Sequence, residues 1–231
     1  MVVPKQAFGA AKNVSAEFLD NFQMDGLLGL AFRKINSIKP VQQNTFFENL
    51  KPNLAAPLFA TALRSNAPGT YDFGFIDQSK YKGTLAYTEV DSSSGHWKIY
   101  VTGSSMLNYG FHAIVDSGST LALLQPEYVD AYWAKVPHAV HDDTAGGYIF
   151  PCDADLPDFW LKIGGAKHVI SGDYLNNGYM DDSGVMCFGA LQSNNGFINA
   201  ILGQTFMKGR YIVHEDSNGL PRMGLARLAH L

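Results

Sequence analysis

The residues best suited to take part in a reaction are an acid and the small hydroxyl-bearing residues that follow it. The apolar run 113–115 ends at Asp116, a Ser-Gly-Ser-Thr turn comes next, and a second apolar run covers 121–124. Short apolar runs bounded by turn residues predict buried strands. The acid is therefore expected on a tight turn at the end of a strand, where a carboxylate needs hydrogen bonds or a partner charge to hold it.

The turn after the acid suits this requirement. Ser117 and Ser119 offer hydroxyl groups, and Gly118 allows backbone to approach other backbone or a ligand closely. Asp-Ser-Gly alone is an ordinary turn sequence, so the tripeptide by itself is weak support for a function. The apolar runs on both sides strengthen the hypothesis of a functional acid, and the rest of the chain has to decide it.

Other chemistries find little support. The sequence has no serine-hydrolase elbow, zinc-protease helix motif or dinucleotide-binding glycine pattern, and we expect no metal and no cofactor. His138 and His141 have a spacing that could bind a metal on a helix, but Pro137 and the acids at 142–143 predict a loop. The other histidines are scattered and expected to be structural: His96, His112, His168, His214 and His230. The acids expected in solvated turns are Asp25, Asp153, Asp155, Asp181 and Asp182.

Composition indicates an ordinary folded protein. The 231 residues are 46% hydrophobic and 16% charged, which suits one large domain or two unequal ones. The net charge is −4 and the 17 basic residues form no run, which argues against nucleic acid or an anionic membrane as a partner. No apolar stretch is long enough to span a bilayer. The 23 glycines, 15 phenylalanines and 11 tyrosines, with many short apolar runs, favour a mostly β structure.

The two cysteines give information about the redox compartment of the protein. Cys152 and Cys187 form no Cys-x-x-Cys pair and have no histidine at zinc-ligand spacing, so one disulfide is the better prediction, with two free buried thiols as the alternative. A disulfide implies an oxidising compartment. The glycosylation sequon at 13–15 agrees with secretion. The first residues have no signal-peptide pattern, so we expect a piece of something longer.

Short strands at regular spacing dominate the predicted secondary structure, which is typical of β-sandwiches or distorted barrels. Helices are predicted only at 15–19, 45–50 and 126–133, and a loop at 77–82. A weak internal echo relates Leu27-Leu28-Gly29 to Ile201-Leu202-Gly203. The predicted strands cover 57–65, 70–76, 85–90, 97–101, 148–152, 159–163, 168–170, 185–190, 199–202, 211–215 and 222–226.

A set of short motifs in a fixed order resembles the pepsin-like aspartic endopeptidases, most of all their secreted fungal members. The matching segments run through essentially the whole chain, and their order and spacing make the resemblance specific. They lie at 25–32, 71–77, 81–83, 95–97, 113–124, 150–152, 156–159, 187–189, 201–203 and 223–226.

The resemblance implies a fold and a set of site residues. The family has a bilobal, all-β fold with a few short helices, in which each lobe supplies one Asp-Thr/Ser-Gly loop braced by an apolar-apolar-Gly segment. It implies that Asp116 is the catalytic acid of the C-terminal lobe, braced by 201–203. It places Ser117 in a crossed hydrogen-bond pair beneath the two acids. The remaining implied roles are substrate backbone binding for Gly118 and Ser119, with Ser117 beside them, and a disulfide between Cys152 and Cys187.

The sequence also departs from the family pattern, and these departures are as informative as the matching segments. Only the brace of the N-terminal lobe is present, at 27–29, and the sequence before it is too short for that lobe's Asp-Thr-Gly loop. The flap hairpin that closes over substrate has no counterpart either, and Gln204 stands where the family often has Asp. We therefore expect residues 1–76 to be a remnant of the N-terminal lobe with an interdomain strand, and 77–231 to be a complete C-terminal lobe.

One acid does not complete the family's chemistry. There, two carboxylates share a proton across a bound water, and a missing general acid or base typically lowers the rate by about 10²–10⁴. Three hypotheses remain open. The chain could be an endopeptidase completed by a second copy facing Asp116, an inactive binding or effector protein on the same scaffold, or a truncated product that needs the missing N-terminal segment. The first and third imply a peptide or protein substrate, and the resemblance with the disulfide implies a secreted protein.

Overall fold

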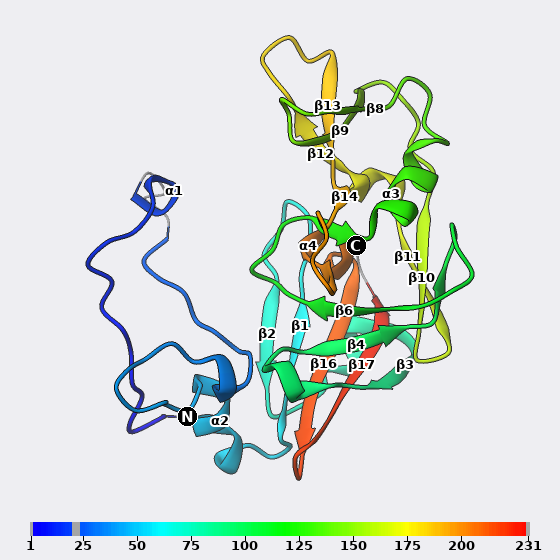
Figure 1. The fold of residues 1–231 in the computed structure, drawn as a ribbon. Coiled ribbons are helices and arrows are strands. Elements are labelled where there is room, and N and C mark those ends of the chain that lie inside the picture. Colours follow the sequence, from blue (N-terminus) through cyan, green and yellow to red (C-terminus); the bar gives the residue numbers. More distant parts are fainter. Residues whose placement is uncertain (1, 20–23, 230–231) are drawn as a thin grey trace.

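The structure, a computed structural model, describes residues 2–19 and 24–229. As predicted, it is mostly β-sheet with a few short helices (Figure 1). One five-stranded sheet has the order β2-β1-β16-β17-β3 and another the order β14-β7-β15-β6-β4. The first contains β1 (Leu58–Ala62), β2 (Thr70–Phe73), β3 (Tyr81–Glu89), β16 (Arg210–Ser217) and β17 (Leu220–Leu228). The second contains β4 (Lys98–Val101), β6 (Phe111–Val115), β7 (Ala122–Leu124), β14 (Leu191–Ser193) and β15 (Ala200–Leu202).

Two smaller sheets and short helices complete the described part of the chain. The sheets have the orders β12-β13-β9-β8 and β11-β10-β5. Their strands are β5 (Gly103–Ser104), β8 (Val140–Asp142), β9 (Gly147–Pro151), β10 (Phe159–Ile163), β11 (Ala166–Ile170), β12 (Asn176–Tyr179) and β13 (Met186–Gly189). The α-helices are α1 (Ala16–Leu19), α2 (Phe46–Leu50), α3 (Pro126–Trp133) and α4 (Gln204–Met207). The 3-10 turns are η1 (Arg33–Ile35), η2 (Lys51–Asn53), η3 (Gln78–Lys80), η4 (Ser92–Ser94) and η5 (Gly172–Leu175).

Two loop predictions were wrong in part. The loop expected at 77–82 already contains η3 and the start of β3 at Tyr81. The loop expected around His141 contains the strand β8. This strand forms because its residues pair with β9 in a hairpin, and the local turn residues do not predict that pairing. The four-residue helix α4 was not predicted at all, since it is too short for a helical period to show.

Helix α3 closes the core beside the second sheet. Pro126 occupies its first turn, where the missing N–H is not needed. Its buried aromatic side chains keep their polar ends paired: the Tyr132 hydroxyl donates to the Pro157 carbonyl at 2.8 Å, and Trp133 Nε1 donates to the Leu191 carbonyl at 2.8 Å. Burying such a side chain typically stabilises the fold by about 1.5–3 kcal/mol, and these hydrogen bonds avoid the penalty for its polar atom.

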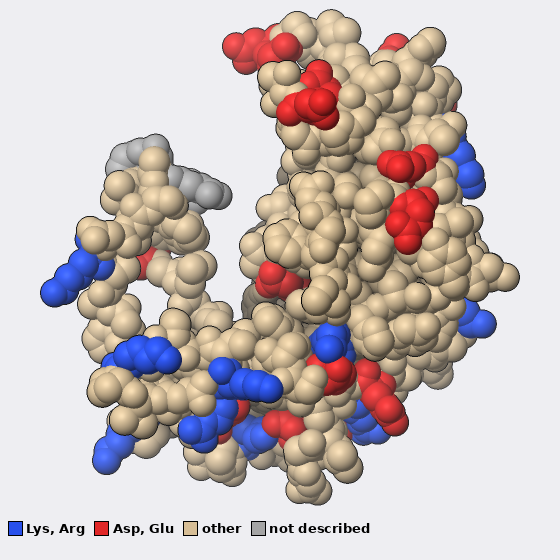
Figure 2. Space-filling view, viewed as in Figure 1, with Lys and Arg blue, Asp and Glu red and all other residues tan. Residues whose placement is uncertain are grey.

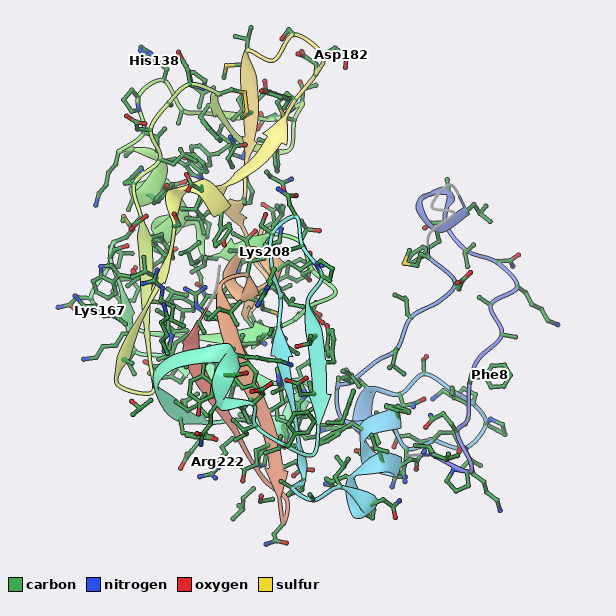
Figure 3. All side chains as sticks on the ribbon, turned by 180° about the vertical axis from the view of Figure 1, so that it is seen from behind. Phe8, His138, Lys167, Asp182, Lys208 and Arg222 are labelled. Atoms are coloured by element: carbon green, nitrogen blue, oxygen red, sulfur yellow. A yellow bond between two sulfur atoms is a disulfide. The ribbon has the colours of Figure 1, made fainter. Side chains whose placement is uncertain are left out.

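The N-terminal segment packs against this body in the region of Trp97. Trp97 of the loop before β4 donates to the Leu30 carbonyl at 2.9 Å, and its ring lies 4.6 Å from the Phe32 ring. Before this contact the chain runs as an extended loop that stands away from the strands, with Phe8 on it (Figures 1 and 3). Leu27 and Leu28, implied to brace a catalytic loop, are 79% and 62% exposed. A Cβ added at Gly29 would meet no atom within 4 Å, so among the described residues this first brace packs against no loop.

Basic and acidic side chains gather on different parts of the molecule, and the disulfide lies in the acidic part. Figure 2 shows basic side chains gathered over the N-terminal segment and α2, and acidic ones over the sheet of β8, β9, β12 and β13. The Cys152–Cys187 disulfide links that sheet across a sequence separation of 35 residues. Such a bond typically stabilises a fold by about 2–4 kcal/mol. None of the described helices has the length and apolar character needed to cross a membrane.

We expect acid to destabilise the chain through His214. Its ring is 3% exposed, stacks on Phe59 at 4.3 Å, and burial lowers its pKa from 6.5 to about 3. Between pH 6.5 and 3 the unfolded chain therefore binds a proton at this histidine that the folded chain does not bind. The free energy of unfolding falls as the pH drops through this range. His214→Phe should reduce that loss by about 4 kcal/mol over this pH range, measured by urea unfolding as a function of pH. The exposed His112→Phe is the control, and an equal pH dependence in both variants would contradict this role of His214.

Candidate active site

The loop that carries the predicted catalytic acid joins two strands held by a third. Strand β6 pairs in parallel with β15, which brings Val115 opposite Leu202, and β15 also pairs antiparallel with β7. The backbone N–H of Asp116 donates to the Leu202 carbonyl at 3.1 Å. The acid therefore stands at the end of a buried strand, at the junction of β6, β7 and β15.

Both carboxylate oxygens of Asp116 have donors from its own loop. Oδ1 accepts the Gly118 backbone N–H at 2.9 Å, and Oδ2 accepts the Ser119 hydroxyl at 2.6 Å. The side chain is half-buried, and no ion pair with it occurs among the described residues. A carboxylate oriented on both oxygens and free of a fixed cation has the geometry to accept a proton from water.

Gly203 follows β15 and packs against the back of this loop. Its N–H donates to the Leu121 carbonyl at 3.2 Å. A Cβ at this position would lie 2.3 Å from the Leu121 oxygen and 2.4 Å from the Ser119 oxygen. Only glycine fits the gap, so the implied brace is a steric requirement of the fold.

Helix α4 adds polar contacts that the sequence reading missed. The Gln204 side chain donates to the Ser117 carbonyl at 3.0 Å, and its backbone N–H donates to the Ser119 carbonyl at 2.7 Å. Thr205 donates to the Thr120 carbonyl from its backbone N–H at 3.0 Å and from its hydroxyl at 2.9 Å. The polar Gln-Thr pair directly after the brace was the only sequence signal for these positioning residues.

The four predicted site residues of the loop lie together, while their roles remain predictions. Ser119 and Gly118 orient the acid, and Ser117 is held through its carbonyl. The Ser117 hydroxyl has no hydrogen bond within the described part of the chain. The predicted disulfide residues lie elsewhere, Cys187 in β13 and Cys152 directly after β9.

A second Asp-Ser-Gly tripeptide occurs at Asp182, where a solvated turn was expected. It lies in the exposed turn between β12 and β13, and Figure 3 shows Asp182 at the far end of that hairpin. The adjacent Ser183 donates to Asp181, whose pKa these hydrogen bonds lower. Among the residues that the structure describes, no strand junction or glycine brace surrounds this copy. The same three residues thus form a candidate site in one place and a surface turn in the other.

The described residues contain no group of three or more histidines, cysteines or acids that could hold a metal ion. His141 contacts Asp143 at 3.1 Å without a third ligand nearby. The donor set around Asp116, a carboxylate with a serine hydroxyl and backbone N–H groups, suits hydrolysis with a carboxylate-activated water.

The chain is similar to known aspartic proteases in sequence and in fold. The family model described as eukaryotic aspartyl protease matches residues 1–228. Penicillopepsin-1 of Talaromyces stipitatus is 49% identical over 217 residues, covering 92% of this chain and 55% of the relative. Aspergillopepsin-1 of Aspergillus flavus is 45% identical over 229 residues, covering 97% of this chain and 56% of the relative. The chain thus spans about half the length of these curated relatives.

A solved structure of low sequence identity has a similar fold. The crystal structure of an aspartic proteinase from Irpex lacteus superposes with a TM-score of 0.78 at 23% identity, covering 98% of this chain and 73% of that one. At this identity the likeness concerns the fold alone.

Proposed function

Because the chain belongs to the eukaryotic aspartyl protease family, we propose that it supplies one half of the active site of an acid endopeptidase, in which Asp116 activates the attacking water. The observation that carries the proposal is the carboxylate of Asp116, held on both oxygens by Gly118 and Ser119 at a braced strand junction. Peptides or proteins are the substrates, and Gly118 and Ser119 contact their backbone.

A second acid has to come from outside this loop. The other Asp-Ser-Gly tripeptide is on an exposed turn and has no brace within the described part of the chain. The proposal therefore includes a partner: a second copy of this chain, or a polypeptide that carries the N-terminal lobe's Asp-Thr-Gly loop. Exposed Leu27 and Leu28 support such a partner, because apolar side chains left in water favour association.

We also divide the chain at residue 76. Residues 1–76 belong with the N-terminal lobe and the interdomain strands, and residues 77–231 form the C-terminal lobe. The pairing of β1 with β16, and of β2 with β1, in one sheet supports an interdomain role for these strands. An extracellular location is part of the same proposal, supported by the disulfide and by the exposed sequon residue Asn13.

An inactive binding protein on this scaffold is the second candidate. The exposed position of Asp182 favours it, since the only other Asp-Ser-Gly in the printed sequence offers no second catalytic loop. Such a protein would keep the peptide-binding face around Gly118 and lose hydrolysis.

Cleavage of an unstructured protein substrate at acidic pH, with and without pepstatin, separates these cases. For a self-completing site, the specific activity should rise with the concentration of this chain. For a site completed by the other lobe, activity should appear when the unmatched half of penicillopepsin-1 is added. Absence of pepstatin-sensitive cleavage in both arms would overturn the protease proposal, and peptide binding without cleavage would then select the binding protein.

A further inference from the structure

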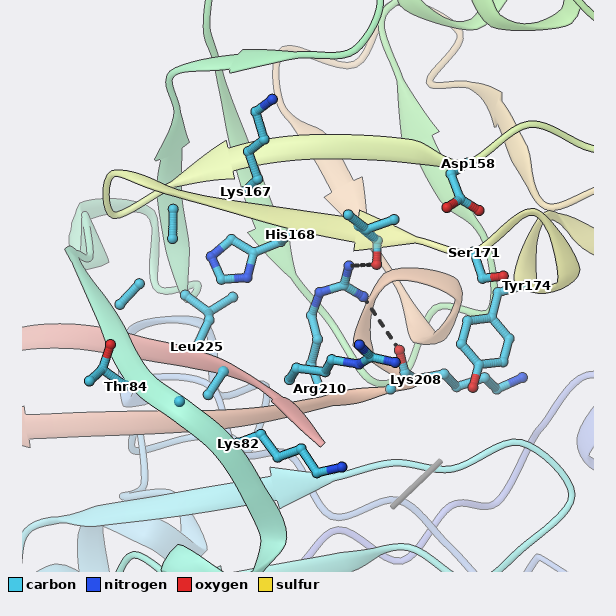
Figure 4. A pocket seen from close by; sticks show the side chains of 17 residues that line it. Lys82, Thr84, Asp158, Lys167, His168, Ser171, Tyr174, Lys208, Arg210 and Leu225 are labelled. Carbon is cyan, nitrogen blue, oxygen red and sulfur yellow. Dashed lines mark hydrogen bonds between the residues drawn. The ribbon is translucent and has the colours of Figure 1, made fainter. Parts of the chain in front are cut away.

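A cavity of about 570 Å³ lies between the first five-stranded sheet and the hairpin of β10 and β11, away from the catalytic loop. Residues of β3, β11, β16 and β17 line it, together with the turn before β16 and residues just before and just after the β10–β11 hairpin, and no residue of the loop 116–121 does. Figure 4 shows Lys82, Lys208 and Arg210 on its sheet side and His168 on its hairpin side. The proposed protease function uses none of these residues.

Three cations form a row across neighbouring strands at this cavity. Strand register places Arg210 of β16 opposite Arg227 of β17, and Arg227 opposite Lys82 of β3. Directly opposite residues share one face of a sheet, and like charges in that position are destabilising. All three residues line the cavity, so three positive charges that repel one another border the same cavity.

Arg210 is the buried member of the row. Its side chain is 4% exposed, and Phe206 lies against its guanidinium at 4.2 Å. Its two terminal nitrogens donate only to backbone carbonyls, those of Phe206, of Lys208 at 3.4 Å and of Val169 at 2.5 Å. Its Nε has no acceptor among the described residues. The guanidinium is thus held in place by neutral groups and leaves one donor unused.

No fixed acid balances these charges. Asp158 is the one acid among the described residues that line the cavity; its Oδ1 accepts the Gly172 N–H at 3.0 Å, and it forms no ion pair with the row. Within the described part of the chain, Lys82, Arg210 and Arg227 take part in no ion pair. This is notable in a chain whose net charge is −4. Burial of the unpaired charge lowers the pKa of Arg210 to about 9.

We infer that this cavity binds a tetrahedral oxyanion, a sulfate or phosphate group, on the row formed by Arg210, Arg227 and Lys82. Guanidinium groups match oxyanions in geometry and form charge-assisted hydrogen bonds to them. Donors on three adjacent strands can reach more oxygens than a planar carboxylate presents, which favours a tetrahedral group. The cavity volume is in the range of small-ligand sites, so the group can be a free ion or part of a small phosphate ester.

Calorimetric titration of the whole chain with sulfate and with inorganic phosphate, at constant ionic strength set by chloride, tests the site. We expect saturable binding at one site per chain, weakened by about tenfold or more in Arg227→Gln and in Lys82→Gln. Both side chains are exposed, so these variants should fold. The control is Lys135→Gln, an exposed lysine outside the cavity that should bind like the original chain.

A second arm identifies the source of the group and guards against a structural effect. Tighter binding of glycerol phosphate than of inorganic phosphate indicates an ester, and equal binding indicates a free ion. In low-salt buffer without oxyanion, Arg227→Gln should have a Tm equal to or above that of the original chain, because a repulsion is removed. With saturating sulfate the order should reverse. Absence of saturable binding, equal binding by Arg227→Gln and Lys135→Gln, or preference for acetate would overturn the inference.

Discussion

Asp116→Asn is expected to lower peptide hydrolysis by about 10³-fold or more in whichever assembly completes the site. The amide keeps the size of the side chain, but it cannot take a proton from the attacking water. It also turns an NH₂ group towards the Gly118 N–H or the Ser119 hydroxyl, both of which donate to the carboxylate in this structure. Loss of the base and a mismatch of donors therefore act together.

The chain provides a matched control for this substitution. Asp182→Asn changes the same tripeptide on an exposed turn and should leave hydrolysis unchanged. Activity is measured on the completed assembly, and the near-ultraviolet circular dichroism and Tm of each variant check the fold. A variant Asp116→Asn that keeps more than a tenth of the activity, or an equal loss in Asp182→Asn, would exclude Asp116 as the base.

The comparison of these two tripeptides shows what local sequence can predict. Apolar runs around Asp116 predicted the strands β6 and β7, and the turn residues around Asp182 predicted a solvated turn. The N-terminal end of α3 was predictable because Pro126 marks a first helical turn. In each case the deciding information lies within a few residues of the element.

Features that depend on distant pairing were not predictable from the residues alone. The parallel pairing of β6 with β15 joins segments far apart in the chain; the family resemblance implied only that residues 201–203 brace the loop, not how the strands pair. The row of Arg210, Arg227 and Lys82 exists only once three strands take their register. The contacts of Gln204 with the catalytic loop need the same pairing, because they follow from where β15 ends.

The two apolar-apolar-Gly segments illustrate the same limit. Their sequences echo each other, yet residues 201–203 form a buried brace, while Leu27 and Leu28 are exposed. The difference is the presence of a loop to support. A brace is therefore a relation between two segments, and its sequence pattern alone does not show whether the relation is formed.

Gly203→Ala should be the most damaging single-methyl substitution at the candidate site. Gly203 has φ −78° and ψ −162°, so alanine is allowed by its backbone and the effect is purely steric. The new methyl group would meet the carbonyl oxygens of Leu121 and Ser119 at 2.3 and 2.4 Å, and both are backbone atoms that cannot rotate away. We expect the free energy of unfolding to fall by about 3 kcal/mol or more.

The same substitution should also lower hydrolysis, because the clash acts on the loop that orients the acid. Moving the Ser119 backbone away from the methyl group breaks its hydrogen bond with the Gln204 N–H and draws its hydroxyl from Asp116. Gly29→Ala is the control: it alters the echoing segment, has no atom within 4 Å of the added Cβ, and should change stability by less than about 1 kcal/mol in either direction. Urea unfolding and peptide hydrolysis measure the two effects, and similar values for the two variants would show that Gly203 does not brace the loop.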